Sequence, residues 1–256
     1  MKVSIIIPVY NEVHALRAVL DRVMHAPLPA GCSKEVIVVD DGSTDGTTQL
    51  LAEFRDAPLL AIHHSVVNFG KGAAIRIGVA KAAGDIVLIQ DGDLEYDPAD
   101  YVAVLQPIVN GSADVVYGSR FLGSLRDGRH GMKRSNWVAN KILTLAANLL
   151  YGAGLTDEAT AYKAFRTAVL RRLRLQCMRF EFCPEVTAKV RRLGVAIHEV
   201  PISYNPRGIL EGKKIRWQDG FHALWTLLRC RVSRRENVET PAGSRLPVAR
   251  SSRAGA

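Results

Sequence analysis

Short apolar runs alternate with amphipathic segments through the first ninety residues, and this alternation limits the fold more than any other feature. Residues 3–7, 35–39 and 85–89 are such runs, rich in Val, Ile and Leu. Runs of this length and composition are typical of strands buried on both faces. After the first run, apolar residues that include Leu16 and Leu20 recur at helical spacing. The alternation predicts an α/β fold, with a mainly parallel sheet that helices cover on both faces.

The same patterns place the remaining elements and suggest one domain over residues 1–232. We expect further strands near residues 59–62, 114–117 and 195–204. We expect helices near residues 71–83, 98–109, 136–150, 164–173, 184–193 and 217–230. Asn11 is expected to be the N-cap of the first helix. Residues 233–256 are basic, rich in Arg, Ser, Pro and Gly and poor in apolar residues, so we expect a disordered tail.

Acidic side chains cluster just after the run at residues 85–89. Asp91, Asp93 and Glu95 stand at alternate positions, and such neighbours repel one another unless a cation lies between them. Mg²⁺ and Mn²⁺ prefer oxygen ligands and are often held by one or two carboxylates plus substrate phosphates. The alternative is an acidic turn that caps the helix beginning at Pro98. In parallel sheets ligands bind beyond the carboxyl ends of the strands, which is where Asp91 falls.

Two further polar turns follow strand ends or begin helices. Residues 68–72 (NFGKG) match neither a P-loop nor a dinucleotide-binding motif. They suit either backbone N–H groups and Lys71 beside a diphosphate, or a turn followed by a basic helix. In the DDGSTD turn at residues 40–45, Asp45 is expected to cap a helix. Asp40 and Asp41 are expected to hydrogen-bond a base or ribose.

The charge indicates which classes of partner the protein could bind, and the cysteine content indicates its redox environment. The net charge is +9, and the basic residues concentrate after Gly118, which suggests an anionic partner such as nucleic acid, a membrane surface or a phosphorylated substrate. The four cysteines form no CxxC pair and are interpreted as reduced thiols of a cytosolic protein. We expect no signal peptide, because the chain starts directly on a strand. No apolar run reaches the roughly 20 residues that span a bilayer.

Several motifs in order resemble the family 2 inverting glycosyltransferases of GT-A fold. They are IIPVYNE (6–12), VVDDGSTD (38–45), the NFGKG turn and QDGD (90–93). Later blocks resemble the dolichol/polyprenyl-phosphate mannosyltransferase branch: YGSRF (117–121), TDEAT (156–160), YKAFR (162–166), FEFCPE (180–185), EGKKI (211–215) and WQDG (217–220). The resemblance covers roughly residues 3–230.

The resemblance implies a set of site residues. It implies a donor-nucleotide site formed by Pro8, Tyr10, Glu12, Asp40, Asp41, Lys71 and Asp91. It implies a site for Mg²⁺ or Mn²⁺ at Asp91, Asp93 and Glu95, although relatives often carry Gln in place of Glu95. It implies an acceptor-phosphate site and closing loop formed by Arg120, Arg134, Arg207, Lys213 and Lys214. Asp91, Asp93, Arg120 and Arg134 are the implied catalytic residues. Val138 stands where some relatives carry a serine.

The implied reaction is the inverting transfer of a hexose, with mannose from GDP-mannose as the leading donor, to a polyprenyl phosphate. The second half offers arginines rather than an evident general base, which fits an acceptor that is already an anion. A donor such as UDP-glucose and a saccharide-hydroxyl acceptor remain open. The QxxRW signature of processive synthases is absent, since Lys213 stands where Gln belongs. A nucleic-acid-binding module is the alternative of another class, but it lacks a recognisable motif.

Two helices raise the question of a membrane. The expected helices at 136–150 and 217–230 are amphipathic, flanked by basic residues, and the second carries tryptophan. Such helices can lie in a lipid interface, so we expect peripheral attachment to the cytoplasmic leaflet, helped by the basic tail. The alternative is that they pack against the sheet, and this is what we expect of Leu145 and Leu149.

Overall fold

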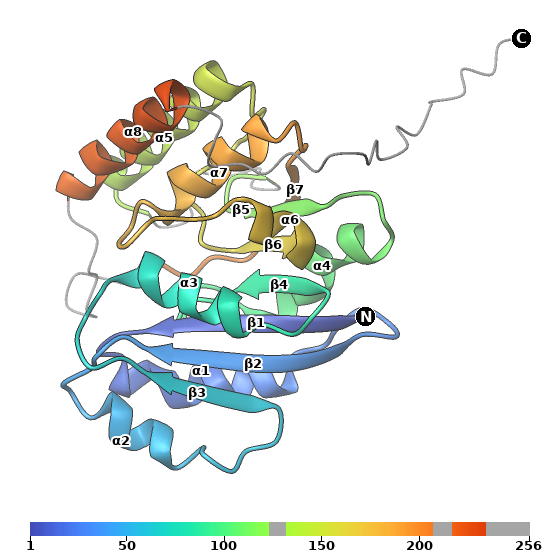
Figure 1. The fold of residues 1–256 in the computed structure, drawn as a ribbon, viewed down its shortest axis with the longest axis vertical. Coiled ribbons are helices and arrows are strands. Elements are labelled where there is room, and N and C mark those ends of the chain that lie inside the picture. The colour runs from blue at the N-terminus through green and yellow to red at the C-terminus, as the bar shows by residue number, and fades with distance from the viewer. Residues whose placement is uncertain (123–131, 207–216, 234–256) are drawn as a thin grey trace, which may run out of the picture.

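A computed structural model describes residues 1–122, 132–206 and 217–233 of the chain, as Figure 1 shows. The predictions for Arg207, Lys213 and Lys214, and for almost all of the tail at 233–256, lie outside the described residues.

The strands form one seven-stranded sheet in the order β3-β2-β1-β4-β6-β5-β7. Their bounds are β1 Lys2–Val9, β2 Ser33–Asp40, β3 Leu60–His64, β4 Ile86–Ile89, β5 Val115–Ser119, β6 Lys163–Arg166 and β7 His198–Pro201. Strands β1 to β4 pair in parallel, and β5 pairs in parallel with β7. Strand β6 runs antiparallel to both of its neighbours. The prediction of a mainly parallel α/β sheet is confirmed.

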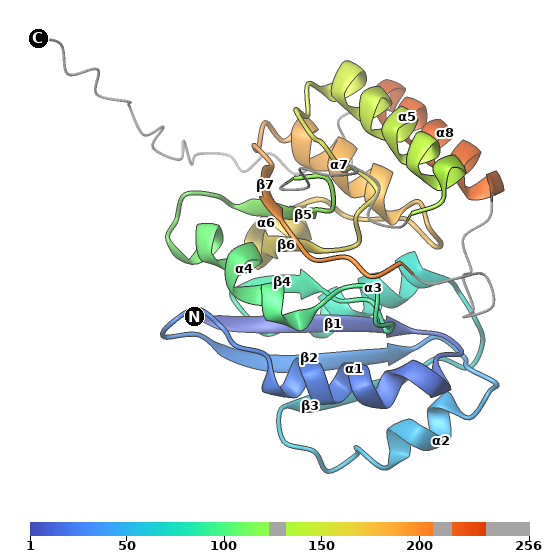
Figure 2. The same cartoon turned by 180° about the vertical axis from the view of Figure 1, so that it is seen from behind.

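Helices cover both faces of this sheet, as Figures 1 and 2 show. Their bounds are α1 Val13–His25, α2 Thr47–Ala52, α3 Lys71–Lys81, η1 Pro98–Asp100, α4 Tyr101–Val109, α5 Arg134–Tyr151, α6 Thr167–Arg172, α7 Phe182–Arg192 and α8 Trp217–Val232. Helices α1 and α4 pack on one face, and α3, α6 and α7 on the other. Each strand of the first half alternates with a helix, so its carboxyl end is free to carry a site.

Helices α5 and α8 form an additional layer. They lie side by side over α7, at the top of Figure 1, and share a small core with it that includes Leu143, Ala147, Ala188 and Leu227. The layer therefore packs on a helix rather than on the sheet. Within the described residues no helix is both long and apolar enough to cross a bilayer.

The expectation that Leu145 and Leu149 pack against the sheet is wrong. Their side chains are 58% and 78% exposed. The exposed large apolar residues of these two helices form what we call the outer face: Val138, Ile142, Leu145, Leu149, Phe221, Trp225, Leu228 and Val232. The apolar stripe read from the sequence is real, but it points away from the core.

Two local predictions are also wrong. Residues 163–166 form strand β6, whereas a helix was expected from residue 164. Strand β6 buries Lys163, whose ammonium donates hydrogen bonds to the carbonyls of Glu158 and Thr160 at 2.8 and 2.7 Å. Asn11 does not cap α1, because its side chain accepts a hydrogen bond from Thr44 N at 2.8 Å and the N-cap position is Glu12.

Candidate active site

A pocket of about 1390 Å³ opens at the carboxyl ends of β1 and β4 and extends beneath α5 and α8. Most of the predicted site residues line it: Pro8, Tyr10, Glu12, Asp41, Lys71, Asp91, Asp93, Glu95 and Arg120. Asp40 and Arg134 are not among the lining residues. The topology thus gathers side chains that lie up to 112 residues apart, from Pro8 to Arg120.

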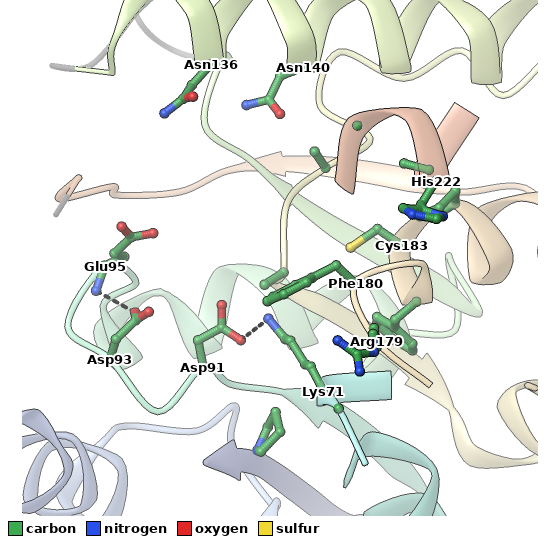
Figure 3. A pocket seen from close by; sticks show the side chains of 18 of the residues that line it. Lys71, Asp91, Asp93, Glu95, Asn136, Asn140, Arg179, Phe180, Cys183 and His222 are labelled. Carbon is green, nitrogen blue, oxygen red and sulfur yellow. Dashed lines mark hydrogen bonds and ion pairs between the residues drawn. The ribbon is translucent and has the colours of Figure 1, made fainter. Parts of the chain in front are cut away.

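The acidic end of the pocket lies just after β4. Asp91 forms an ion pair with Lys71, the first residue of α3, and Figure 3 shows the two side chains pointing toward each other. Burial alone would lower the pKa of Lys71, but Asp91 outweighs it and raises this pKa above the usual value. Asp93 accepts a hydrogen bond from Glu95 N at 3.0 Å, which fixes the turn between them.

The hydroxyls of two tyrosines fix the residue that follows β4. Gln90 is fully buried, and its side-chain oxygen accepts hydrogen bonds from the hydroxyls of Tyr101 and Tyr162, both at 2.9 Å. Because Gln90 immediately precedes Asp91, these bonds fix the direction in which the acidic turn leaves the sheet.

Asp40 holds a turn together and does not face the pocket. Its carboxylate accepts hydrogen bonds from Ser43 N at 3.1 Å and from the Thr48 hydroxyl at 2.6 Å, and His64 Nδ1 lies 3.1 Å away. Burial would raise the pKa of Asp40, but these hydrogen bonds outweigh burial and lower it. Asp40 therefore supports the shape of the 41–45 turn, and its predicted contact with the nucleotide stays a prediction.

Asp45 is not the N-cap of α2, because Gly46 holds that position, but its carboxylate contacts the start of two helices. Its carboxylate accepts hydrogen bonds from Thr47 N at 3.0 Å, in the first turn of α2, and from Val13 N at 3.2 Å, in the first turn of α1. One carboxylate thus satisfies N–H groups of two helices that would otherwise lack partners.

Three backbone N–H groups of the glycine turn before α3 are already bonded within the protein. Asp41 accepts hydrogen bonds from Phe69 N at 2.9 Å and Gly70 N at 2.6 Å. Gly72 N donates to the carbonyl of Arg179 at 3.0 Å. Gly70 has φ +103°, and a Cβ there would lie 2.4 Å from the carbonyl oxygen of Met178, so the turn requires glycine. The N–H groups of Gly70 and Gly72 are occupied, and the turn contributes Asn68, Gly70 and Lys71 to the pocket lining.

Arg120 is fixed by a buried carboxylate. Its guanidinium donates to both oxygens of Asp157, at 2.7 and 2.8 Å, and its backbone N–H donates to the same carboxylate at 3.0 Å. Burial would lower the pKa of Arg120, but Asp157 raises it well above the ordinary value. Arg134 is the exposed first residue of α5. Its role in gripping an acceptor phosphate stays a prediction, as does that of Arg120.

Several pocket residues were missed from the sequence. Arg179 lines the pocket near Lys71, and Asn136 and Asn140 point into it from α5 on the opposite wall, as Figure 3 shows. The two asparagines are four residues apart, which places them on one face of a helix. Arg179 directly precedes the FEFCPE block, and this position was the only sequence signal for it.

The carboxylates fit a divalent cation that a substrate helps to hold. Among the described residues, no three His, Cys, Asp or Glu side chains gather closely enough to hold a metal ion by themselves. Glu95 accepts a hydrogen bond from the Tyr204 hydroxyl at 3.3 Å. Asp91 and Asp93 still provide two carboxylates in the pocket, and Mg²⁺ commonly takes one or two of these and completes its shell with water and phosphate.

Comparison with known proteins places this site in a family. The family model described as "Glycosyl transferase family 2" matches residues 4–174, more than half of the chain. An undecaprenyl-phosphate mannosyltransferase of Micrococcus luteus is 31% identical over 91% of this chain and 99% of that protein. A dodecaprenyl-phosphate galacturonate synthase of Rhizobium johnstonii is 28% identical over 74% of this chain. The chain spans only 55% of the length of that second relative.

Solved structures share the architecture. A glucosyl-3-phosphoglycerate synthase from Mycobacterium tuberculosis, in complex with phosphoglyceric acid, superposes with a TM-score of 0.67 at 22% identity. The match covers 90% of this chain and 79% of that one. At this identity the likeness concerns the fold, and with the sheet described above it supports the GT-A fold. The family match, the full-length relative and the pocket at the strand ends agree: this chain is a glycosyltransferase that belongs to glycosyl transferase family 2.

Proposed function

We propose that the chain transfers a hexose from a sugar nucleotide to a polyprenyl monophosphate, with mannose from GDP-mannose as the first candidate. One observation carries the proposal: a single pocket joins the acidic end at Asp91 to the apolar layer of α5 and α8. Ile142, Leu143, Phe221 and Leu224 line the second part of that pocket. A phosphate on an isoprenoid chain needs both surroundings, one polar and one apolar.

The donor would bind at the end that carries Lys71 and Arg179. Both are cationic groups in the pocket, and they suit a diphosphate. Asp91 and Asp93 would hold Mg²⁺ or Mn²⁺, which when bound neutralises charge on the departing nucleoside diphosphate. The likeness to a synthase structure that contains Mn²⁺ and UDP, with a TM-score of 0.65, supports a metal in this fold.

The acceptor needs positioning more than activation. A monophosphate is already anionic at neutral pH, so it requires no general base to attack the sugar carbon. Arg120 lines the pocket with its guanidinium fixed by Asp157, and a planar guanidinium of this kind can orient a phosphate. The name of the full-length Micrococcus relative, an undecaprenyl-phosphate mannosyltransferase, supports this acceptor class.

A UDP-sugar is the second candidate donor. A UDP-N-acetylglucosamine–dolichyl-phosphate N-acetylglucosaminyltransferase of Methanococcus voltae is 28% identical over 91% of this chain and 97% of its own length. The names of relatives of similar length therefore differ in the sugar but agree on a lipid phosphate. The family assignment favours a transferase over a nucleic-acid-binding module.

The outer face supports attachment to the cytoplasmic surface of a membrane. Its apolar side chains are flanked by the exposed basic residues Lys133, Arg134, Arg229 and Arg231. Exposed apolar side chains on neighbouring helices with basic residues near their ends are typical of contact with an anionic lipid interface. The lipid phosphate would then enter the pocket between α5 and α8 from the bilayer.

A transfer assay tests the proposal. Purified protein is incubated with Mn²⁺, a short polyprenyl phosphate and labelled GDP-mannose, UDP-glucose or UDP-N-acetylglucosamine. We expect one donor to be used and Asp93→Ala to reduce its transfer at least about a hundredfold, because charge neutralisation by a metal supplies several kcal/mol. Asp97→Ala is the matched control, since Asp97 caps η1 and does not line the pocket. Absence of transfer from all three donors would contradict the proposal.

A further inference from the structure

Lys71 and the proposed cation compete for one carboxylate. The Lys71 ammonium forms an ion pair with Asp91, and the side chains of the two residues are 24% and 15% exposed. Asp91 is also the residue that follows β4 and leads the acidic turn. A cation that binds Asp91 must therefore approach a position that a positive charge already holds.

The backbone on both sides of Lys71 is fixed, so only its side chain can change partner. Gly70 N donates to Asp41, and Gly72 N and Ala73 N donate to the carbonyls of Arg179 and Met178, each at 3.0 Å or less. The Lys71 side chain, in contrast, has a flexible four-carbon stem with a charge at its tip. Movement of the ammonium by a few ångströms requires no change in the turn.

The charges favour binding of cation and diphosphate together. A dication at Asp91 repels the adjacent ammonium, and this repulsion is substantial at contact distance even where water screens it. A nucleoside diphosphate brings new anionic oxygens that both the cation and the ammonium can contact. When Lys71 moves away, Asp91 becomes available to the cation. Asp93 and Glu95 line the same pocket and add further carboxylates.

We propose that Lys71 is an exchangeable counter-ion. Its ammonium pairs with Asp91 in the donor-free enzyme, and it moves to the donor diphosphate when the cation binds Asp91 instead. The inference rests on the proposed function, since it requires a sugar nucleotide and a divalent cation at this site. Its consequence is that Lys71 weakens binding of the cation alone and strengthens binding of the diphosphate, so that the enzyme takes up the two together.

Titration with Mn²⁺ in the absence of nucleotide tests the first half. Free Mn²⁺ is followed by electron paramagnetic resonance for the full chain, for Lys71→Met and for Lys71→Gln. We expect both variants to bind Mn²⁺ about tenfold more tightly than the wild type, because they lose a repulsive charge beside Asp91. Lys81→Met is the matched control: it removes the same charge from the exposed C-terminal end of the same helix and should bind Mn²⁺ as the wild type does.

Calorimetric titration with GDP and with UDP in the presence of saturating Mn²⁺ tests the second half. The nucleotide that the wild type binds should bind Lys71→Met about tenfold more weakly and Lys81→Met equally well. Mn²⁺ affinities that are equal in Lys71→Met, Lys71→Gln and Lys81→Met overturn the inference. If the wild type also binds no Mn²⁺ when GDP or UDP is present, the metal-dependent function fails with it. If the wild type does bind Mn²⁺ with nucleotide, only the role of Lys71 is rejected.

Discussion

Helices α1 and α5 carry similar apolar stripes, and the fold uses them in opposite ways. The stripe of α1 is Leu16, Val19, Leu20 and Val23, and all four side chains are buried against the sheet. The stripe of α5 is Val138, Ile142, Leu145 and Leu149, and all four side chains are exposed. Periodicity identified both helices correctly. It did not identify which of the two stripes would be covered.

The difference follows from the layers. Helix α1 lies directly on β1 and β2, whereas α7 already covers the sheet beneath α5. The inner face of α5 is therefore short and partly polar, with Leu143, Thr144 and Ala147 as its buried residues. Four exposed large apolar side chains at helical spacing on one helix are typical of a contact site. The comparison thus separates an apolar stripe that stabilises the fold from one that is available for a partner.

The largest expected difference between α1 and α5 is the loss of stability when an aspartate replaces a leucine in each apolar stripe. Leu20→Asp should lower the free energy of unfolding by at least about 4 kcal/mol, because it leaves a cavity and buries an unpaired carboxylate. Leu149→Asp should change it by no more than about 0.5 kcal/mol, as surface substitutions usually do. Chemical denaturation monitored by circular dichroism measures both.

The two leucines are matched in residue type, with Leu20 inside α1 and Leu149 in the last turn of α5, so each variant is the control of the other. If Leu149→Asp destabilised the chain as much as Leu20→Asp, Leu149 would be buried in a core in solution. The proposed difference between the two helices would then be wrong.

Most of the fold was predictable because the strands are buried on both faces. Strands β1, β2 and β4 contain the apolar runs IIIPV, VIVV and IVLI, and such runs have few other interpretations. Strand β6 was missed because its four residues include Lys163 and Arg166 and lead directly into α6. Burial of Lys163 depends on carbonyls of Glu158 and Thr160 that only the tertiary structure brings near.

The candidate site was predictable where a residue is placed by a strand end and not where it is placed by packing. Asp91 and Lys71, both predicted for the donor-nucleotide site, line one pocket and form an ion pair, while their roles in binding stay predictions. Asp40 sits at a strand end too, but neighbouring side chains use its carboxylate, which no pattern reveals. Arg179 and Asn140 reach the pocket because α5 and the turn before α7 fold over it, and this is a matter of tertiary packing.

Helices α1 and α5 also differ in the buried groups that hold them to the rest of the fold. The buried stripe of α1 contains no titratable group, whereas Glu158 lies fully buried beneath α5. Its backbone N–H donates to the Thr144 hydroxyl of α5 at 3.1 Å, and its carboxyl accepts from the Thr187 hydroxyl of α7 at 3.1 Å. Burial raises the pKa of Glu158 to about 7, against the effect of nearby Lys163. The other carboxyl oxygen of Glu158 has no hydrogen-bond partner.

Stability should therefore depend on pH through Glu158. Between its ordinary pKa of 4.5 and about 7, folded Glu158 keeps a proton that the unfolded chain has released. The free energy of unfolding should fall as pH rises through this window, by an amount on the order of 3 kcal/mol, and then level off. Glu158→Gln should remove this part of the dependence. Urea unfolding at pH 5 and 7.5 measures it, with Glu53→Gln, at the exposed ion pair with Arg17 of α1, as the control.

The smallest expected effect is on binding, and it tests what covers the outer face. Leu149→Ser combined with Trp225→Ser should reduce partition onto anionic vesicles about tenfold or more, because each side chain would bury apolar surface in the interface. Val66→Ser combined with Val67→Ser is the control, since these valines are also exposed but lie between β3 and α3. Co-sedimentation at low and moderate salt separates the apolar contribution from that of the basic rim, which salt screens. Equal partition of both double variants would mean that the outer face does not contact lipid, and a protein partner would then have to cover it.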